Sequence, residues 1–249
     1  MADLRAGAPR VCNGSMRFRL LACDYDRTIA LNGVVPDPTR RALRDVRDSG
    51  RSLVLVTGRT MAELLDVFDE LTLFARIIVE NGAVLCEPAS GAERVLSPPV
   101  PARLVEELRR REVQPLIVGK GIISTAEPND AQVLVALSEL GLDLKLSYNR
   151  DSVMILAPNV SKATGLRAAA DSINIPLDEA VAVGDGENDL ALLDAAGIGV
   201  AVENAVGPLK DHADIVLTRP AAEGIRELCD SLVRHDLADL LEEASAAPA

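Results

Sequence analysis

The chain has 249 residues, of which 48% are hydrophobic and 26% are charged, and its formal net charge is −12. This composition is typical of a soluble globular protein with one large domain or two modest ones. The negative charge argues against nucleic acid or an anionic membrane surface as the main partner, so a phosphorylated substrate would need locally concentrated positive charge.

The cysteines are widely spread and form no C-x-x-C pair, which argues against a disulfide framework or a zinc site; they are Cys12, Cys23, Cys86 and Cys229. A reducing cytoplasm fits this usage. No apolar run approaches the roughly 18 to 20 residues that span a bilayer. Residues 1–15 lack the apolar core of a secretory signal, and we interpret them as a disordered leader, with Met16 as an alternative start to Met1.

Three apolar runs of strand length open the chain, at 18–23, 52–56 and 75–79. Helical patterns separate them, at 37–50 and from 60 to 71. The alternation of strand and helix predicts a parallel sheet with helices on both faces. Asp37 is expected to cap the first helix, and Thr60 with Glu63 to form a capping box on the second.

The pattern changes after Gly82. Residues 83–158 combine short strand candidates at 84–86, 116–123, 142–146 and 152–156 with helices at 102–112 and 129–140. We interpret this stretch as an inserted second domain of α+β type.

The first pattern then resumes, with a helix at 161–173, strands at 180–183, 198–202 and 214–217, and a mostly helical end from 221 to about 243. The predicted fold is therefore α/β: a doubly wound parallel-sheet core, residues 16–82 and 159–249, that carries the insertion 83–158.

The apolar runs share one property, because each ends in side chains suited to anionic or metal chemistry. These are Asp24 and Asp26, Thr57, Asn81, and the acidic stretch Asp185 to Asp189. An isolated Asp-x-Asp pair would explain itself equally well as a turn cap. In open α/β sheets, however, ligands bind at the carboxyl ends of the strands, so we expect all these groups in one crevice.

Four carboxylates in that crevice, from Asp24, Asp26, Asp185 and Asp189, would repel one another strongly in a partly desolvated site. A divalent cation removes this problem. Ligands that are all oxygen indicate Mg²⁺ and argue against zinc. The chain's two histidines fall outside these motifs and are interpreted as ordinary surface or interface side chains.

Lys162 lies in the first turn of its predicted helix, where a cation opposes the helix dipole at a cost of roughly 0.3 to 1 kcal/mol. One interpretation is an exposed lysine that tolerates this penalty. The other is that the lysine and the helix N-terminus both face a bound anion, such as a phosphoryl group.

Four motifs occur in order: Asp24-Tyr25-Asp26-Arg27-Thr28, Thr57-Gly58-Arg59, Ser161-Lys162-Ala163-Thr164-Gly165-Leu166 and Gly184-Asp185-Gly186-Glu187-Asn188-Asp189. This quartet resembles the haloacid dehalogenase superfamily of aspartate-nucleophile phosphotransferases. The insertion after Asn81-Gly82 resembles the type IIB cap of Cof-type and sucrose-phosphatase-like phosphatases. Arg27 departs from the family, which most often has Gly there, and we expect this to affect loop packing or access, not the reaction class.

The resemblance implies a role for each acidic residue. Asp24 would attack phosphorus and form an aspartyl-phosphate. Asp26 would act in turn as general acid and base, and its backbone carbonyl would bind Mg²⁺ together with the carboxylates of Asp24 and Asp185. Asp189 would hold the metal directly or through water.

The resemblance also implies which groups hold the phosphoryl oxygens. Thr57, Lys162 and Asn188 would grip them, since phosphoryl transfer depends mostly on positioning and electrostatics. Gly58 would leave its backbone N–H approachable. Arg59 would either reach the substrate or brace the cap.

The resemblance implies a magnesium-dependent phosphatase, active in carbohydrate metabolism, that hydrolyses a small phosphorylated metabolite. The compact insertion and the scarcity of aromatic residues favour phosphoglycolate, with sugar phosphates next. Lys120 and Arg150 are interpreted first as solvated surface, and alternatively as cap residues that select a substrate carboxylate or sugar. We expect no nucleic-acid or membrane partner, and a monomer or homodimer.

Two alternatives remain open. One is a phosphomutase of the same fold. The other is a non-catalytic module that resembles a signalling receiver or binds a partner. A receiver carries its phosphorylated Asp at the third strand, whereas the third run here ends in Glu80-Asn81.

Overall fold

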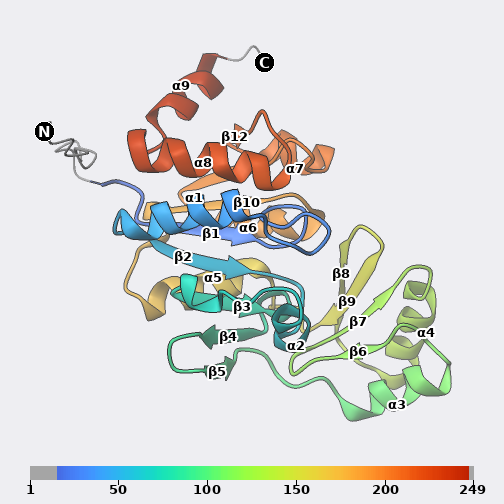
Figure 1. The fold of residues 1–249 in the computed structure, drawn as a ribbon. Coiled ribbons are helices and arrows are strands. Elements are labelled where there is room, and N and C mark those ends of the chain that lie inside the picture. The colour runs from blue at the N-terminus through green and yellow to red at the C-terminus, as the bar shows by residue number, and fades with distance from the viewer. Residues whose placement is uncertain (1–15, 247–249) are drawn as a thin grey trace, which may run out of the picture.

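The computed structural model describes residues 16–246, so the expected leader at 1–15 lies outside the described residues. Within this range the chain forms two lobes, a core lobe built on one large sheet and a smaller lobe built on a second sheet (Figure 1). Strands of the core sheet run in the order β12-β11-β10-β1-β2-β3-β4-β5. Their bounds are β1 Leu20–Asp24, β2 Ser52–Val56, β3 Arg76–Val79, β4 Val84–Glu87, β5 Ala92–Val95, β10 Ala180–Gly184, β11 Ile198–Ala201 and β12 Ile215–Val216.

The strands from β12 to β3 are parallel, and helices cover both faces of the sheet. Helix α1 packs with α8 on one face, and α5 packs with α6 on the other, as right-handed crossovers require. The core helices are α1 Asp37–Asp48, α2 Met61–Leu65, α5 Lys162–Ser172, α6 Leu190–Ala195, α7 Gly207–His212, α8 Ala221–His235 and α9 Ala238–Ala246. The predicted α/β class, with a parallel-dominated central sheet, is confirmed.

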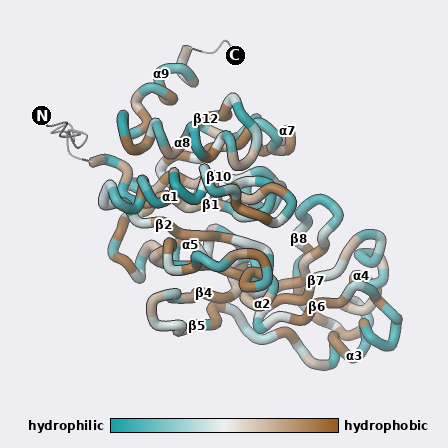
Figure 2. The backbone as a smooth tube through the Cα atoms, in the orientation of Figure 1, coloured by the Kyte–Doolittle hydropathy of each residue, from teal (hydrophilic) through white to brown (hydrophobic). Residues whose placement is uncertain are grey.

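Buried strands form the centre of this lobe. All five residues of β1 and all five of β10 are buried, which explains why both read as continuous apolar runs and not as alternating ones. Figure 2 shows the hydrophobic residues concentrated along the central strands, with hydrophilic stretches on the outer turns and helices. Among residues 16–246, no helix has both the length and the apolar character needed to cross a bilayer.

The strand expected at 84–86 belongs to the core sheet, and its assignment to the insertion is wrong. It forms β4, which pairs antiparallel with β3, and β5 follows as the edge strand. The reason is the tight turn Glu80–Gly82, which folds the chain straight back instead of leading it into a crossover. The smaller lobe therefore begins after this hairpin.

The smaller lobe, residues 102–156, contains an antiparallel sheet in the order β6-β7-β9-β8. Its elements are α3 Ala102–Arg110, β6 Ile117–Val118, β7 Ile122–Ala126, α4 Asp130–Leu140, β8 Lys145–Asn149 and β9 Ser152–Leu156. Ile123 and Ile155 pack with the buried leucines of α3 and α4 on one face of the sheet. Ile122 and Met154 join the core lobe's hydrophobic cluster on the other.

Two helix predictions need correction. Pro36 is the N-cap of α1, and Asp37 lies in the first turn, where its charge favours the helix dipole without a capping hydrogen bond. The capping box of Thr60 and Glu63 is present, but α2 ends at Leu65. Phe68 lies beyond the end of the helix, where it packs against the rings of Tyr25 and Phe74 at centroid distances of 6.1 and 6.0 Å.

The mostly helical end expected from 221 to about 243 consists of two helices, α8 and α9. Asp236 and Leu237, both with positive φ, separate α8 from α9. The Asp236 carboxylate accepts hydrogen bonds from the backbone N–H of Arg17 (2.6 Å) and the guanidinium of Arg51 (2.9 Å). The helix breaks where this side chain ties the end of α8 to the start of β1.

Candidate functional site

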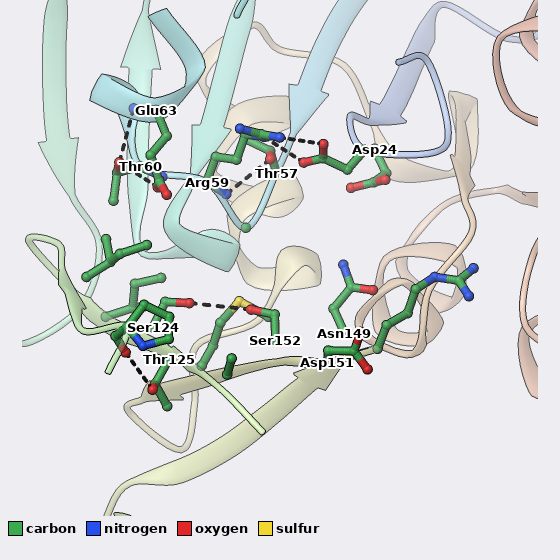
Figure 3. Close-up of a pocket in the computed structure, with 18 of the residues that line it drawn as sticks. Asp24, Thr57, Arg59, Thr60, Glu63, Ser124, Thr125, Asn149, Asp151 and Ser152 are labelled. Carbon is green, nitrogen blue, oxygen red and sulfur yellow. Dashed lines mark hydrogen bonds and ion pairs between the residues drawn. The ribbon is translucent and has the colours of Figure 1, made fainter. Parts of the chain in front are cut away.

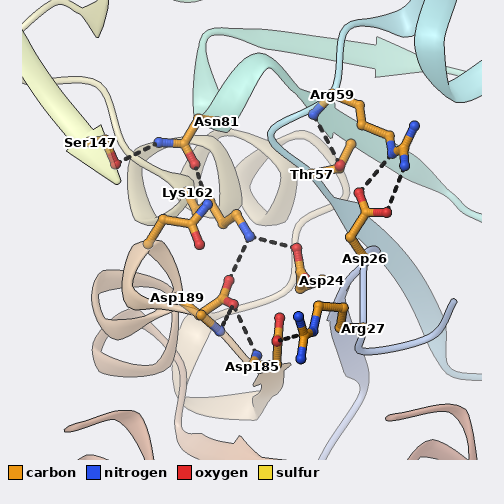
Figure 4. A network of polar contacts seen from close by, with 12 residues as sticks. Asp24, Asp26, Arg27, Thr57, Arg59, Asn81, Ser147, Lys162, Asp185 and Asp189 are labelled. Atoms are coloured by element: carbon orange, nitrogen blue, oxygen red, sulfur yellow. Dashed lines mark hydrogen bonds and ion pairs between the residues drawn. The ribbon is translucent and has the colours of Figure 1, made fainter. Parts of the chain in front are cut away.

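The carboxyl ends of β10, β1, β2 and β3 lie side by side in the sheet, and the side chains singled out from the sequence gather there (Figure 4). Asp24 ends β1, Asp185 follows β10, Thr57 follows β2 and Asn81 lies in the turn after β3. The parallel register of β1 with both neighbours brings these ends to one edge.

Three buried carboxylates form the centre of the site. One oxygen from each of Asp24, Asp185 and Asp189 lies within 4.8 Å of the others. The Nζ atom of Lys162, a residue with 0% exposure, donates to Asp24 Oδ1 and Asp189 Oδ1, both at 2.6 Å. Asp189 Oδ2 accepts the backbone N–H groups of Asp185 and Gly186, each at 3.0 Å. Lys162 is therefore not an exposed lysine.

Burial is the largest single influence on the pKa of Asp24, Asp185 and Lys162. It raises the pKa of Asp24 to about 8, although Lys162 opposes the rise, while the nearby Asp189 and Asp185 add to it. Burial also raises the pKa of Asp185. For Lys162, burial alone would lower the pKa, but Asp189 and Asp24 outweigh it and raise the pKa above its usual value. The lysine stays charged and pairs with two of the three carboxylates.

The residues present fit a hard divalent cation. Asp24 Oδ2 is buried and has no hydrogen-bond partner among the described residues. An unsatisfied carboxylate oxygen beside two further carboxylates is costly unless a cation neutralises it. The group offers only oxygen atoms, which are the ligands that Mg²⁺ prefers.

Asp26 points its carboxylate away from this group. Its two oxygens accept hydrogen bonds from Nε and Nη2 of Arg59, both at 2.7 Å, in a bidentate ion pair. The guanidinium of Arg59 also lies 5.6 Å from the ring centroid of Tyr25. Arg59 thus braces Asp26 and not the smaller lobe. Because Arg59 binds both carboxylate oxygens of Asp26, the backbone carbonyl is the group of Asp26 that remains available to a metal.

Thr57 and Gly58 lie at the end of β2, beside Asp24. Thr57 is buried, and its Oγ1 accepts the backbone N–H of Arg59 at 3.1 Å. A Cβ on Gly58 would approach Met154 Sδ to 3.2 Å, so the smaller lobe packs closely over this glycine. A Cβ here would require the Met154 side chain to shift by a few tenths of an ångström.

Sequence reasoning placed Asn81 at a strand end but did not find its partner. Asn188 Nδ2 donates to Asn81 Oδ1 at 3.0 Å, and Asn81 Nδ2 donates to Ser147 Oγ at 3.4 Å. Glu80, Asn81 and Gly82 have φ values of 54°, 54° and 106°. The Asn-Gly pair was the available signal, since both residues tolerate the left-handed conformation.

Two arginines reach Asp185. Arg150 Nη2 donates to Asp185 Oδ2 at 2.8 Å, and Arg27 Nε lies 3.5 Å from the same oxygen. The interpretation of Arg150 as solvated surface is wrong, because its side chain is 30% exposed and faces the acidic group. Lys120, in contrast, pairs with Glu93 at the exposed surface. No local sequence pattern predicts these contacts, since each depends on how segments that are distant in the sequence pack together.

A cavity of about 480 Å³ lies between the lobes, beside Asp24 (Figure 3). Thr57, Arg59 and Asp26 line it on the core side. The smaller lobe contributes mostly neutral side chains, namely Ile117, Ile122, Ser124, Thr125, Asn149, Ser152 and Met154. The Oγ atoms of Ser124 and Ser152 lie 3.4 Å apart on this wall. The wall of the smaller lobe therefore offers mainly hydroxyl and apolar side chains, with Arg150 and Asp151 as its charged members.

Comparison with known proteins identifies similar chains. The model of the haloacid dehalogenase-like hydrolase family matches residues 21–132 and 123–228. The phosphoglycolate phosphatase of Methanothermobacter thermautotrophicus is 27% identical over 224 residues, covering 84% of this chain and 96% of that protein. Phosphoglycolate phosphatase 2 of Saccharolobus solfataricus is 31% identical over 228 residues, covering 86% and 92%. The solved structure of the HAD subclass IIB sugar phosphatase BT4131 superimposes with a TM-score of 0.69 at 19% identity, covering 86% of this chain and 98% of that one.

Proposed function

This chain belongs to the haloacid dehalogenase-like hydrolases and is a phosphatase, and from that premise we propose that it hydrolyses a small phosphorylated metabolite with Mg²⁺ through an aspartyl-phosphate on Asp24. The observation that carries the proposal is the environment of Asp24. Its buried carboxylate pairs with Lys162 through one oxygen and leaves the other without a partner among residues 16–246.

The carboxylates of Asp24, Asp185 and Asp189 and the backbone carbonyl of Asp26 would hold the cation. When bound, Mg²⁺ neutralises these carboxylates and the phosphoryl oxygens. Lys162 lowers the pKa of Asp24 against the effect of burial, and so favours the ionised form that attacks. Gly58, Thr57 and Asn188 would hold the transferring oxygens. One N–H of the Asn188 amide donates to Asn81, and the other would donate to the substrate.

Asp24 attacks phosphorus, and the bond from phosphorus to the leaving oxygen breaks. Asp26 gives that oxygen a proton. In the second step water attacks the phosphorus of the aspartyl-phosphate, Asp26 takes its proton, and Asp24 leaves as a carboxylate with release of phosphate. Since Arg59 binds both oxygens of Asp26, it must free at least one for the carboxyl group to carry a proton.

We propose phosphoglycolate as the first substrate to test, because the two similar proteins described above are named phosphoglycolate phosphatases. Sugar phosphates come next, because the wall of the cavity carries hydroxyl side chains. The smaller lobe acts as the cap that encloses the leaving group. We further propose that the enzyme works in the cytoplasm, as a monomer or homodimer, without nucleic-acid or membrane partners.

Phosphate release from a panel of phosphorylated metabolites, with and without Mg²⁺, tests the proposal. We expect turnover that a chelator abolishes and added Mg²⁺ restores. Asp24→Asn should lower kcat about a thousandfold or more, with an unchanged circular dichroism spectrum, because Asn keeps the side-chain shape and Asp189 still pairs with Lys162. Metal-independent turnover, or full activity in Asp24→Asn, would contradict the proposal.

A further inference from the structure

Arg27 and Arg150 come from different lobes and meet at one carboxylate oxygen. Arg27 lies in the loop after β1, and Arg150 lies in the turn between β8 and β9 of the smaller lobe. Arg150 Nη2 lies 2.8 Å from Asp185 Oδ2, and Arg27 Nε lies 3.5 Å from it. Figure 4 shows Arg27 beside Asp185, on the side of the acidic group away from Lys162.

Both arginines are held in place by their backbones and by Asn204. Arg27 (φ 64°) and Arg150 (φ 52°) adopt the left-handed conformation, which non-glycine residues seldom take. Asn204 Nδ2 donates to the carbonyl of Arg27 at 3.1 Å, and the carbonyl of Asn204 accepts Arg150 Nη2 at 3.4 Å. The backbone N–H of Arg150 also donates to Glu187 Oε2 at 3.3 Å. The contact with Asp185 is therefore a built feature of the fold.

The formal charges of the six side chains that form ion pairs around Asp185 balance. The carboxylates of Asp24, Asp185 and Asp189 face the cationic side chains of Lys162, Arg150 and Arg27. Asp26 and Arg59 form a separate neutral pair. A divalent cation that enters alone leaves the group with two excess positive charges, and a dianionic phosphoryl group restores neutrality. A proton on Asp24 would only increase this excess.

We propose that Arg27 and Arg150 make the binding of the divalent cation and of the phosphoryl group depend on each other. The cation alone binds weakly, because both guanidinium groups repel it. With phosphate present it binds tightly, because the arginines and the cation then share the phosphate's charge. By thermodynamic linkage, the bound cation raises the affinity of the site for phosphate by the same factor. The inference rests on the metal site of the proposed function.

The two arginines should contribute unequally. Arg150 is closer to Asp185 and its side chain is 30% exposed, whereas that of Arg27 is 52% exposed. Water screens the more exposed charge more strongly. Arg150 is part of the smaller lobe, so the position of that lobe against the core also affects the coupling between cation and phosphate binding.

Titration calorimetry on the full, metal-stripped chain tests the inference without any measurement of activity. Mg²⁺ is titrated with and without inorganic phosphate, at constant pH and ionic strength, into the unmodified protein, Arg150→Gln and Arg27→Gln. Arg109→Gln is the matched control, because Arg109 is exposed on α3 and the same charge is lost. We expect Arg150→Gln to bind Mg²⁺ alone about tenfold more tightly, and the enhancement by phosphate to shrink by about tenfold. Arg27→Gln should show smaller changes of the same sign, and Arg109→Gln none.

The opposite sign would overturn the inference. If Arg150→Gln binds Mg²⁺ more weakly, the arginine orients Asp185 for the cation instead of opposing it. An unchanged enhancement by phosphate would also overturn it, while leaving the metal site intact. An unmodified protein that binds no Mg²⁺ even with phosphate would contradict the metal site itself, and the inference with it.

Discussion

Asp26 offers the clearest case of one side chain whose chemistry depends on a single neighbour. Both of its oxygens are bound by Arg59, at 2.7 Å each, and this fork-to-fork geometry fixes the plane of the carboxylate. A lysine at this position would supply the charge but not the two parallel donors. The orientation of the proposed general acid and base is therefore a property of the arginine.

Arg59→Lys should lower kcat about tenfold or more on a substrate with an alkyl leaving group, because a misplaced Asp26 protonates that oxygen poorly. The loss should be smaller on p-nitrophenyl phosphate, whose leaving group needs no proton. Arg44→Lys is the control, since Arg44 pairs with Glu70 through a similar pair of nitrogens. An equal loss on both substrates would contradict a role in proton transfer.

The residues of this site differ in how far the sequence predicts them. Asp24 and Asp185 follow apolar runs of strand length, so topology brings them together, and their carboxylate oxygens do lie within 4.8 Å. The position of Lys162 in the first helical turn is predictable, because the capping residue Ser161 fixes where the helix starts. Arg150 could not be predicted, because its contact depends on where a turn of the smaller lobe meets the core.

At the level of elements, local patterns predicted which segments are strands better than which strands pair. The run 84–86 is a strand, as expected, but it joins the core sheet between β3 and β5. The turn Glu80–Gly82, in which three successive residues have positive φ, determines this strand pairing. A propensity pattern does not report such a turn unless each residue is examined for its tolerance of that conformation.

Gly82 shows how strictly this turn is specified. A Cβ there would lie 1.9 Å from the carbonyl oxygen of Ser161, directly before Lys162, and φ is 106°. Gly82→Ala should therefore lower the free energy of unfolding by about 3 kcal/mol, from left-handed strain and overpacking together. Chemical denaturation measures this value.

Gly91→Ala is the matched control, because Gly91 also has positive φ (71°), but among residues 16–246 no atom beyond its two chain neighbours lies within 4 Å of the point that a Cβ would occupy there. It should cost about 1 kcal/mol, the strain alone. Equal losses of unfolding free energy in the two variants would mean that the close approach of Gly82 to Ser161 adds nothing to the cost of the substitution.

At the scale of the whole molecule, the smaller lobe is fixed to the core at opposite ends of its sheet. Arg150 holds the β8–β9 turn over Asp185. Glu80 holds the β6–β7 turn, where its buried carboxylate accepts the backbone N–H groups of Lys120 (3.0 Å) and Gly121 (2.7 Å). The cavity lies between these attachments, so the strength of each one sets how the wall of the cavity stands over Asp24.

Glu80→Gln should loosen the β6–β7 attachment while nearly keeping the side-chain volume. One acceptor oxygen becomes a donor that faces a buried backbone N–H, which costs about 2 kcal/mol. Hydrogen exchange should speed up across 117–126, and chemical denaturation should show the loss of stability. Glu93→Gln is the matched control, because Glu93 pairs with the side chain of the same Lys120 at the exposed surface, where an ion pair contributes under about 1 kcal/mol. If both variants change exchange and stability alike, the attachment lies in the lysine side chain and not in the buried carboxylate.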